Sequence, residues 1–171
     1  MRVVRNIILF LITLYVAFVA FMPKEQLYFY LEKELNKNGI VIYNERFKET
    51  PLSLVVSNGV VSYQGVDVAR FSKLEAKIYL LFNQVELENV ELLDLAKKAL
   101  DVELEKLKAS YIISKPFLVT IDAKGSFGTA KGYIDLKKKI LHIDIVDVQN
   151  IIALKKFLRK GEKGWYYEQK F

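Results

Sequence analysis

The stretches that decide the fold are residues 74–80 (LEAKIYL), residues 85–88 (VELE) and residues 140–148 (ILHIDIVDV). Apolar and polar side chains alternate in each, which is typical of a β-strand with one buried and one solvated face. The alternation slips by one residue at Asn89, and we interpret this slip as a β-bulge. These stretches therefore predict a sheet that is half buried and half exposed.

Glycine-containing dipeptides predict where the strands turn. Asn58-Gly59 is a strong hairpin signal, and we expect it to join strands at 52–56 and 60–63. Gln64-Gly65 predicts another tight turn. Further strands are expected at residues 40–43, 117–123, 133–136 and 165–171. Short turns favour consecutive strands that pair as a meander.

Three segments have helical spacing of apolar residues. Residues 24–38 predict an amphipathic helix with Leu27, Tyr30, Leu31 and Leu35 on its apolar face. This face could lie on the membrane surface or on the domain, and we favour the domain because the charges of the helix are balanced. Residues 148–160 predict a second one, with Phe157 and Leu158 buried. The stretch 93–113 fits a helix or a strand, and we divide it into a helix at 93–99 and a strand at 101–113.

Together these elements predict an α+β, mainly β fold. A single N-terminal transmembrane helix precedes an antiparallel β-sheet domain of about seven or eight strands, with an amphipathic helix near each end. We divide the chain into a signal-anchor at 1–22, an amphipathic helix at 23–39 and a β-rich domain at 40–171. One face of the sheet should be apolar and needs cover from these helices or from a ligand.

An apolar run at residues 7–22 contains no charge, and counting from Val3 extends it to 20 residues. A helix of that length is about 30 Å long, the thickness of a hydrocarbon core. A cleaved signal peptide is the main alternative, but Ala17 and Ala20 lack the spacing that cleavage requires. A buried helix of a soluble domain is a third alternative, because the run is apolar all round. We favour an uncleaved anchor.

Charges around the run predict its orientation. Arg2 and Arg5 precede it, whereas Lys24 and Glu25 cancel after it, so the positive-inside rule puts the N-terminus in the cytoplasm. The domain then lies on the other side of the membrane. The chain has no cysteine, which excludes disulfides, cysteine-based metal sites and thiol nucleophiles.

No set of residues predicts catalysis, so we expect a non-enzymatic protein without a cofactor or a metal site. The only histidine, His142, shares a strand face with Asp144, and with Asp147 it lacks the second soft ligand of a metal site. Glu86 and Glu88 alternate with apolar residues, which indicates the solvated face of a strand rather than an acid–base pair.

The net charge of +6 is concentrated in residues 131–171. Four cations there are candidate contacts to lipid headgroups or to an acidic partner, namely Lys155, Lys156, Arg159 and Lys160. The alternative is a solvated face. We expect this basic group to lie near the anchor, because the ends of a small domain are often close. Nucleic acid is not an expected partner for a domain outside the cytoplasm.

Several stretches carry a resemblance to known proteins: an anchor ending in Met22-Pro23, then NGVVSYQGVDVA at 58–69, NQVELENV at 83–90, GSFG at 125–128 and GYIDL at 132–136. This spacing of strands and glycines resembles AsmA-like envelope proteins and the N component of type II secretion systems. The resemblance implies a diderm bacterium, a single-pass inner-membrane anchor and a periplasmic β-domain. It brings no catalytic residues.

Two functions follow as expectations. The first is a scaffold or accessory subunit in envelope assembly or secretion, with the inner membrane and other subunits of a complex as partners. The alternative is a lipid-handling protein that holds acyl chains on an apolar sheet face. A copurified membrane complex would indicate the first, and copurified lipid the second.

Overall fold

The computed structural model describes residues 2–162 and 164–171. The helices are α1 (Arg2–Phe21), α2 (Lys24–Lys37) and α3 (Asp94–Ala99). The strands are β1 (Ile40–Tyr43), β2 (Arg46–Glu49), β3 (Ser53–Ser57), β4 (Val60–Tyr63), β5 (Val66–Ile78), β6 (Phe82–Leu92), β7 (Glu103–Ile112), β8 (Leu118–Gly125), β9 (Gly128–Asp135), β10 (Ile140–Val148), β11 (Arg159–Gly161) and β12 (Gly164–Lys170). The division of 93–113 into helix and strand is confirmed.

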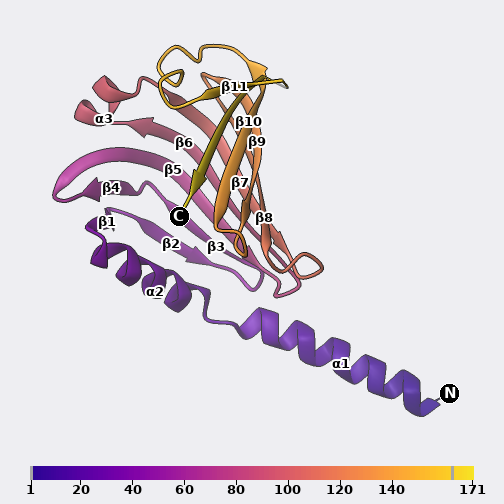
Figure 1. Cartoon of the computed structure of the whole chain (residues 1–171). Helices are drawn as coiled ribbons and strands as arrows, with labels where there is room; N and C mark the ends of the chain where they lie inside the picture. Colours follow the sequence, from indigo (N-terminus) through magenta and orange to yellow (C-terminus); the bar gives the residue numbers. More distant parts are fainter. Residues whose placement is uncertain (1, 163) are drawn as a thin grey trace.

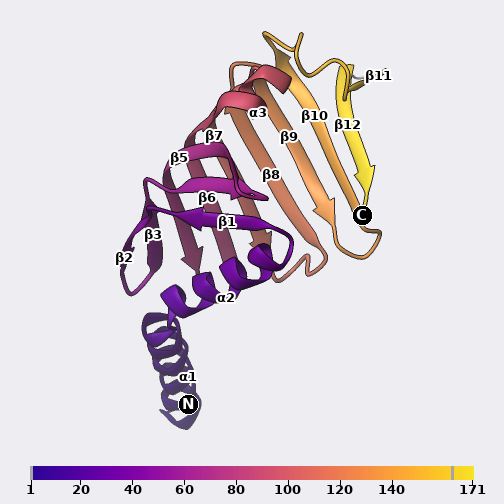
Figure 2. The same ribbon diagram turned by 90° about the vertical axis from the view of Figure 1, so that its left-hand side faces the viewer.

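The described strands form one antiparallel sheet of twelve strands, in place of the seven or eight expected. Its order is β1-β4-β5-β6-β7-β8-β9-β10-β12-β11, and β3 joins β2 to β5. The predicted meander is therefore confirmed from β4 to β10. Figure 1 shows the curved sheet with α1 leaving it at one end. In Figure 2, α2 and β1 lie in front of β5 and β6, while β9, β10 and β12 lie to the side of them.

The helix α1 is the one described helix that is long and apolar enough to cross a membrane. A signal sequence near the N-terminus has the same properties. Along α1 only Val19 is buried, which leaves the rest of its apolar surface uncovered. The structure thus contains a candidate membrane span that does not belong to the core of the domain.

The expected hairpin at Asn58-Gly59 is wrong. The strands β3 and β4 both pair with β5, one with each half of it, so the dipeptide interrupts a single line of pairing. A Cβ on Gly59 would lie 2.1 Å from Cζ of Phe71, whose ring is buried. Glycine is needed here because the Phe71 ring lies against the backbone, and not because the chain reverses.

The expected bulge at Asn89 is also wrong. β6 keeps one register with β5 and with β7 on both sides of this residue. Asn89 instead adopts a left-handed φ of 51° and donates a hydrogen bond to Oγ of Ser72 at 3.0 Å. This kink lets Leu87 and Val90, which are three residues apart, pack against the same core cluster.

The second amphipathic helix, expected at 148–160, is not formed. These residues comprise the end of β10, a series of turns and β11. Single helical turns do occur, since the N–H of Lys155 donates to Ile151 O and that of Leu158 to Leu154 O. From Arg159 onward, however, the backbone pairs with β12 instead. Phe157 is 52% exposed, contrary to expectation, and Leu158 is half-buried.

Two hydrophobic clusters form the core, one toward each edge of the sheet. The first joins Tyr28 of α2 to Leu54, Val56 and Phe71. The second consists of Phe127, Ala130, Ile145 and Ile151. Since Ile151 belongs to the turns after β10, those turns cover the second cluster as α2 covers the first.

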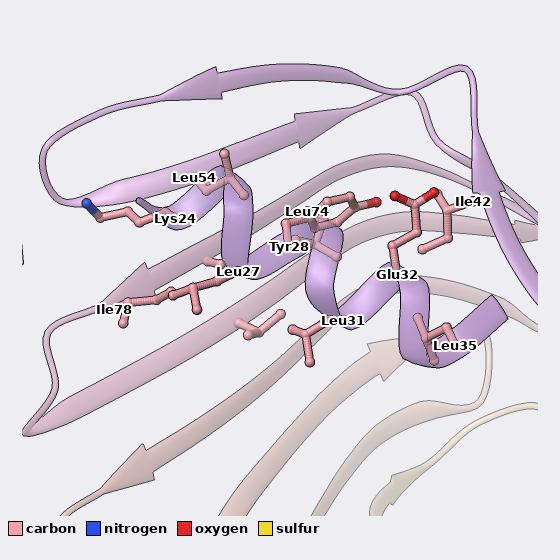
Figure 3. Close-up of a pocket in the computed structure, with 12 residues that line it drawn as sticks. Lys24, Leu27, Tyr28, Leu31, Glu32, Leu35, Ile42, Leu54, Leu74 and Ile78 are labelled. Carbon is pink, nitrogen blue, oxygen red and sulfur yellow. The ribbon is translucent and has the colours of Figure 1, made fainter. Parts of the chain in front are cut away.

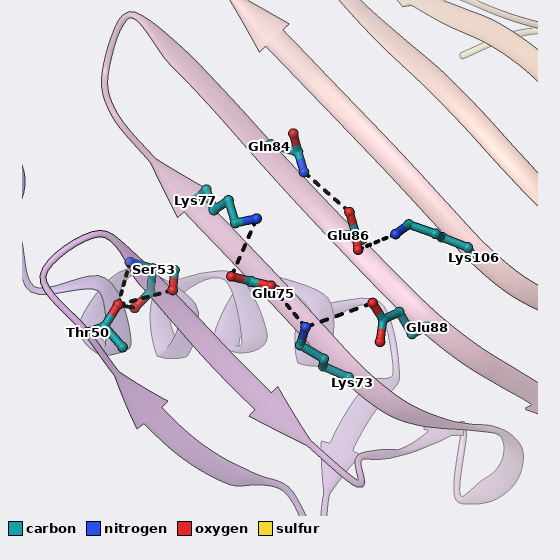
Figure 4. Close-up of polar contacts among 9 residues, drawn as sticks. All are labelled: Thr50, Ser53, Lys73, Glu75, Lys77, Gln84, Glu86, Glu88 and Lys106. Atoms are coloured by element: carbon teal, nitrogen blue, oxygen red, sulfur yellow. Dashed lines mark hydrogen bonds and ion pairs between the residues drawn. The ribbon is translucent and has the colours of Figure 1, made fainter.

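The polar face of the sheet carries ion pairs within β5 and between neighbouring strands (Figure 4). Nζ of Lys106 lies 2.6 Å from Glu86, and Nζ of Lys73 lies 3.0 Å from Glu75 and 3.9 Å from Glu88. The hydrogen bond from Lys73 lowers the pKa of Glu75, and that from Lys106 lowers the pKa of Glu86. Glu86 and Glu88 thus lie on the polar face as predicted, but the Glu86 side chain is only 14% exposed because it pairs with Lys106.

We expect the domain to lose stability in acid as these pairs are protonated. A carboxyl whose pKa is lowered by folding binds protons more readily in the unfolded chain, so its contribution is complete above about pH 4.5 and disappears as the pH falls through the lowered pKa. Urea unfolding at about pH 7 and about pH 3.5 measures this loss. The double variant Glu75→Gln/Glu86→Gln should lose less stability than the wild type when the pH is lowered from about 7 to about 3.5. An equal loss in both proteins would show that Glu75 and Glu86 are not the source of the acid sensitivity.

Candidate functional site

Apolar residues of seven neighbouring strands share one face of the sheet. Directly opposite residues in antiparallel strands project to the same side. One row runs through Val56, Leu74, Leu87, Leu107, Ala123, Ala130 and Ile145, and a second through Leu54, Ala76, Val85, Ala109, Ile121, Gly132 and Ile143. We call these two rows the apolar face. No charged residue interrupts either row.

The middle of the apolar face is only partly covered. Val85 on β6 is 44% exposed, and Leu107, Ala109 and Ile121 on the next strands are half-buried. Ala109, Ala123, Ala130 and Gly132 on β7 to β9 have small side chains, so this part of the face is a shallow trough. With about 4.8 Å between strands, the face extends about 24 Å from β5 to β10. It therefore forms a long apolar strip that is open toward solvent.

The helix α2 forms one wall of this strip. Leu27, Leu31 and Leu35 recur every fourth residue and line a cavity of about 170 Å³ together with Ile78 and Val85. Figure 3 shows the three leucines on the side of α2 that faces the sheet strands below it. Leu31 is nevertheless 61% exposed, so the cavity opens to the outside. The expected packing of α2 on the domain is confirmed, but its leucine stripe is not closed over.

Tyr28 is the anchor of α2, and the sequence did not indicate it because it lies beside the leucine stripe. It is 9% exposed, and its ring contacts that of Phe47 edge-on at 5.1 Å between centroids. Tyr30, which was expected to face the domain, is exposed instead. Burial, with help from the Glu45 and Glu32 carboxylates, raises the pKa of Tyr28, so its hydroxyl stays neutral.

The Tyr28 hydroxyl is the one buried side-chain oxygen or nitrogen without a hydrogen-bond partner among the described residues. We expect Tyr28→Phe to leave the free energy of unfolding unchanged or to raise it by about 1 kcal/mol, because an unpartnered buried hydroxyl is costly. Urea unfolding tests this, with Tyr30→Phe as the exposed control. A loss of more than about 1 kcal/mol would mean that the hydroxyl has a partner in the protein.

The turns after β10 form the other wall. Leu154, Phe157 and Leu158 line a cavity of about 390 Å³ with Phe127 and Ile145 on the sheet. The side chains around it are apolar apart from the Tyr167 hydroxyl. The apolar face is thus bounded by α2 on one side and by residues 151–158 on the other, with a small-residue trough between them.

His142 lies on the polar face and does not join this site. Its ring stacks between Tyr133 and Tyr166, with centroids 5.4 and 5.5 Å away. Nδ1 lies 3.0 Å from Glu168 and Nε2 lies 3.2 Å from Asp144, so the carboxylates contact opposite ring nitrogens and do not converge. Within residues 2–162 and 164–171, no group of three or more His, Cys, Asp or Glu side chains is placed to hold a metal ion.

The candidate basic residues form one group at the end of the sheet farthest from α1. Lys155 and Lys156 lie in the turns after β10, and Arg159 and Lys160 lie on β11. Figures 1 and 2 show β11 and α1 at opposite ends of the molecule, so the expectation that this group lies near the anchor is wrong. Lys156 donates to Ala99 O at 2.9 Å, and Nζ of Lys155 lies 5.9 Å from the Trp165 ring.

Comparisons of this chain with protein-family models, with curated proteins and with solved structures find no match.

Proposed function

We propose that this chain is a non-enzymatic, membrane-anchored binding protein that holds an acyl chain of a lipid on its apolar face. One observation carries the proposal: two uninterrupted rows of apolar residues cross seven strands and stay half-open between two walls. Exposed apolar surface of this extent usually marks a site for an apolar partner. The proposal also places α1 in the inner membrane and the domain in the periplasm.

The dimensions and chemistry of the strip fit an acyl chain. Its length of about 24 Å exceeds the ~15 Å that one leaflet contributes to a hydrocarbon core of about 30 Å. Burial of apolar area on both partners favours binding by about 25 cal/mol per Å². The site thus offers a long apolar surface, and the Tyr167 hydroxyl is the polar group among the side chains around its second cavity.

The face is also placed where lipid is available. The next row toward the α1 end of the strands carries no charge: Tyr111, Val119, Ile134 and Leu141 lie opposite one another, flanked by Asn83 on β6 and Gln169 on β12. If α1 spans the membrane, an acyl chain can pass from the bilayer onto the face without crossing charged residues. A scaffold in envelope assembly or secretion remains the other candidate, because a partner's apolar helix would fit the same strip.

Site-specific photocrosslinking from the membrane tests the proposal. A benzophenone side chain at position 85 projects from the apolar face, whereas one at position 84 on the same strand projects from the polar face. Irradiation of the full chain in native membranes, followed by mass spectrometry, should give lipid adducts at 85 and few at 84. Protein adducts alone at 85 would support the scaffold, and equal adducts at both positions would contradict a specific site.

A further inference from the structure

Three strand-connecting loops form a row of exposed apolar side chains at the α1 end of the sheet. Leu80 and Leu81 lie between β5 and β6, and Leu136 follows β9. Ile112 ends β7, and Ile113 and Phe117 lie in the loop that connects β7 to β8. Each of these six side chains is at least 36% exposed. We call them the apolar rim.

Backbone hydrogen bonds hold the loops of the rim side by side. The N–H of Ile113 donates to Leu81 O at 2.9 Å, and that of Leu136 donates to Phe117 O at 2.8 Å. The rim is therefore a continuous edge and not a set of independent loops. Its exposed leucines, isoleucines and phenylalanine are unusual for loop tips, which are typically polar.

The rim lies beside α1 and not beyond its end. The Tyr15 hydroxyl donates to Tyr79 O, next to Leu80, at 2.5 Å. Tyr15 precedes the last residue of α1 by six positions, which is about 9 Å along a helix axis. A bilayer that contains the whole of α1 would therefore also contain the tip of the β5–β6 loop.

The link between α1 and the domain is fixed by a buried lysine. Lys24 is 1% exposed, and its Nζ donates to Val19 O at 3.1 Å and to Met22 O at 3.2 Å, which satisfies carbonyls at the end of α1. Its backbone N–H donates to Glu49 on β2 at 3.1 Å. These contacts set the angle at which α1 leaves the domain, so the rim keeps its place beside the helix.

Positive charge accompanies the apolar residues of the rim. Lys115 lies in the β7–β8 loop, and Lys137, Lys138 and Lys139 lie between β9 and β10. Asp135 is the acidic residue here, and it pairs with Lys138 at 3.8 Å. Apolar tips flanked by lysines are the composition of segments that lie about 5–10 Å deep in a membrane interface with anionic lipids.

We propose that the apolar rim is inserted in the leaflet from which α1 emerges, so that the strands stand upright on the bilayer with the open strip meeting the lipid. This inference rests on the proposed membrane anchoring by α1. It assigns the loops a lipid partner and explains how an acyl chain would reach the face from the bilayer.

The absence of cysteine makes a depth measurement direct. Full-length single-cysteine variants Leu81→Cys and Ile113→Cys carry an environment-sensitive fluorophore on the rim. Leu95→Cys is the matched control, because this exposed leucine lies on α3 at the other end of β6. Thr13→Cys reports on α1 itself. The proteins are reconstituted in phosphatidylethanolamine–phosphatidylglycerol vesicles that contain a quencher at a shallow acyl position.

Positions 81 and 113 should be quenched several-fold more strongly than position 95, with blue-shifted emission. If position 13 is quenched while positions 81 and 113 behave like position 95, α1 is in the membrane but the rim is not. That result overturns the insertion of the rim and leaves the anchoring intact. If position 13 is not quenched either, the anchoring is overturned and the inference falls with it. Circular dichroism of each labelled variant verifies that the sheet is intact.

Discussion

Replacing Gly128 with alanine is expected to lower the free energy of unfolding by about 3 kcal/mol or more. Gly128 begins β9 at a φ of 101°, which residues with a side chain rarely adopt. A Cβ there would lie 1.8 Å from the backbone oxygen of Asp147 on β10. Because this atom belongs to a paired strand, it cannot move aside as a flexible side chain would.

Gly65 provides a matched control. It also has a positive φ, of 81°, but a Cβ there would have no neighbour within 4 Å. Gly65→Ala should therefore cost about 1 kcal/mol, for the backbone conformation alone. Chemical denaturation of both variants separates the steric part from the conformational part. Equal losses would show that β10 yields at Gly128, which would contradict a rigid β9–β10 pair beneath the second cluster.

The central strands could be predicted from the sequence because the alternation of apolar and polar residues that marks a strand is contained within the strand itself. The alternation in residues 74–80 and 140–148 decides which side chains face the core, whatever strand lies alongside. The helix α2 and its end at Asn38 were also predicted, since a change in apolar period and an Asn-Gly end are visible within a few residues. These features gave the fold class and most of the strand boundaries.

The wrong predictions, a hairpin at Asn58-Gly59 and a helix at 148–160, concern segments whose structure depends on residues far away in the sequence. Asn58-Gly59 is compatible with a hairpin and with a break in one strand, and the ring of Phe71 on β5 selects the break. Residues 151–158 have a helical spacing, yet the chain after them pairs with β12 and leaves room for turns only. The spacing of apolar residues within a segment shows neither where the Phe71 ring will lie nor that β12 will pair with the chain after residue 158.

The candidate site was predicted only in outline. An alternating strand requires an apolar face, and the need for a cover was evident. Which part of the face remains open depends on the cross-strand register and on the place where α2 lies. The place of α2 depends on contacts such as that of Tyr28 with Phe47, and the register depends on pairing between strands; neither is local in the sequence. The trough between the walls could therefore not be assigned to Val85 or Ala109 in advance.

Replacing Val85 with glutamate is expected to reduce copurified lipid at least tenfold while the domain stays folded. Val85 lies at the open middle of the apolar face and lines the cavity under α2. A carboxylate there would have to lose water against the acyl chain, and the cost of burying an unpaired charge exceeds the 1.4 kcal/mol that a tenfold loss represents. Because the side chain is 44% exposed when no lipid is bound, the charge remains solvated in the lipid-free protein.

The matched control is Gln84→Glu, which adds the same charge one residue away on the polar face, opposite Lys77. Val85→Ile keeps the surface apolar and should retain the lipid. Mass spectrometry of protein extracted in mild detergent gives the lipid-to-protein ratio, and urea unfolding verifies the fold of each variant. The proposal requires that lipid is lost in Val85→Glu and retained in both other variants.

If all three variants retain lipid, the lipid is bound elsewhere, and the open face is then free for the apolar helix of a protein partner. If Gln84→Glu loses lipid as well, the added charge acts at long range, and contact with the strip is not what holds the lipid.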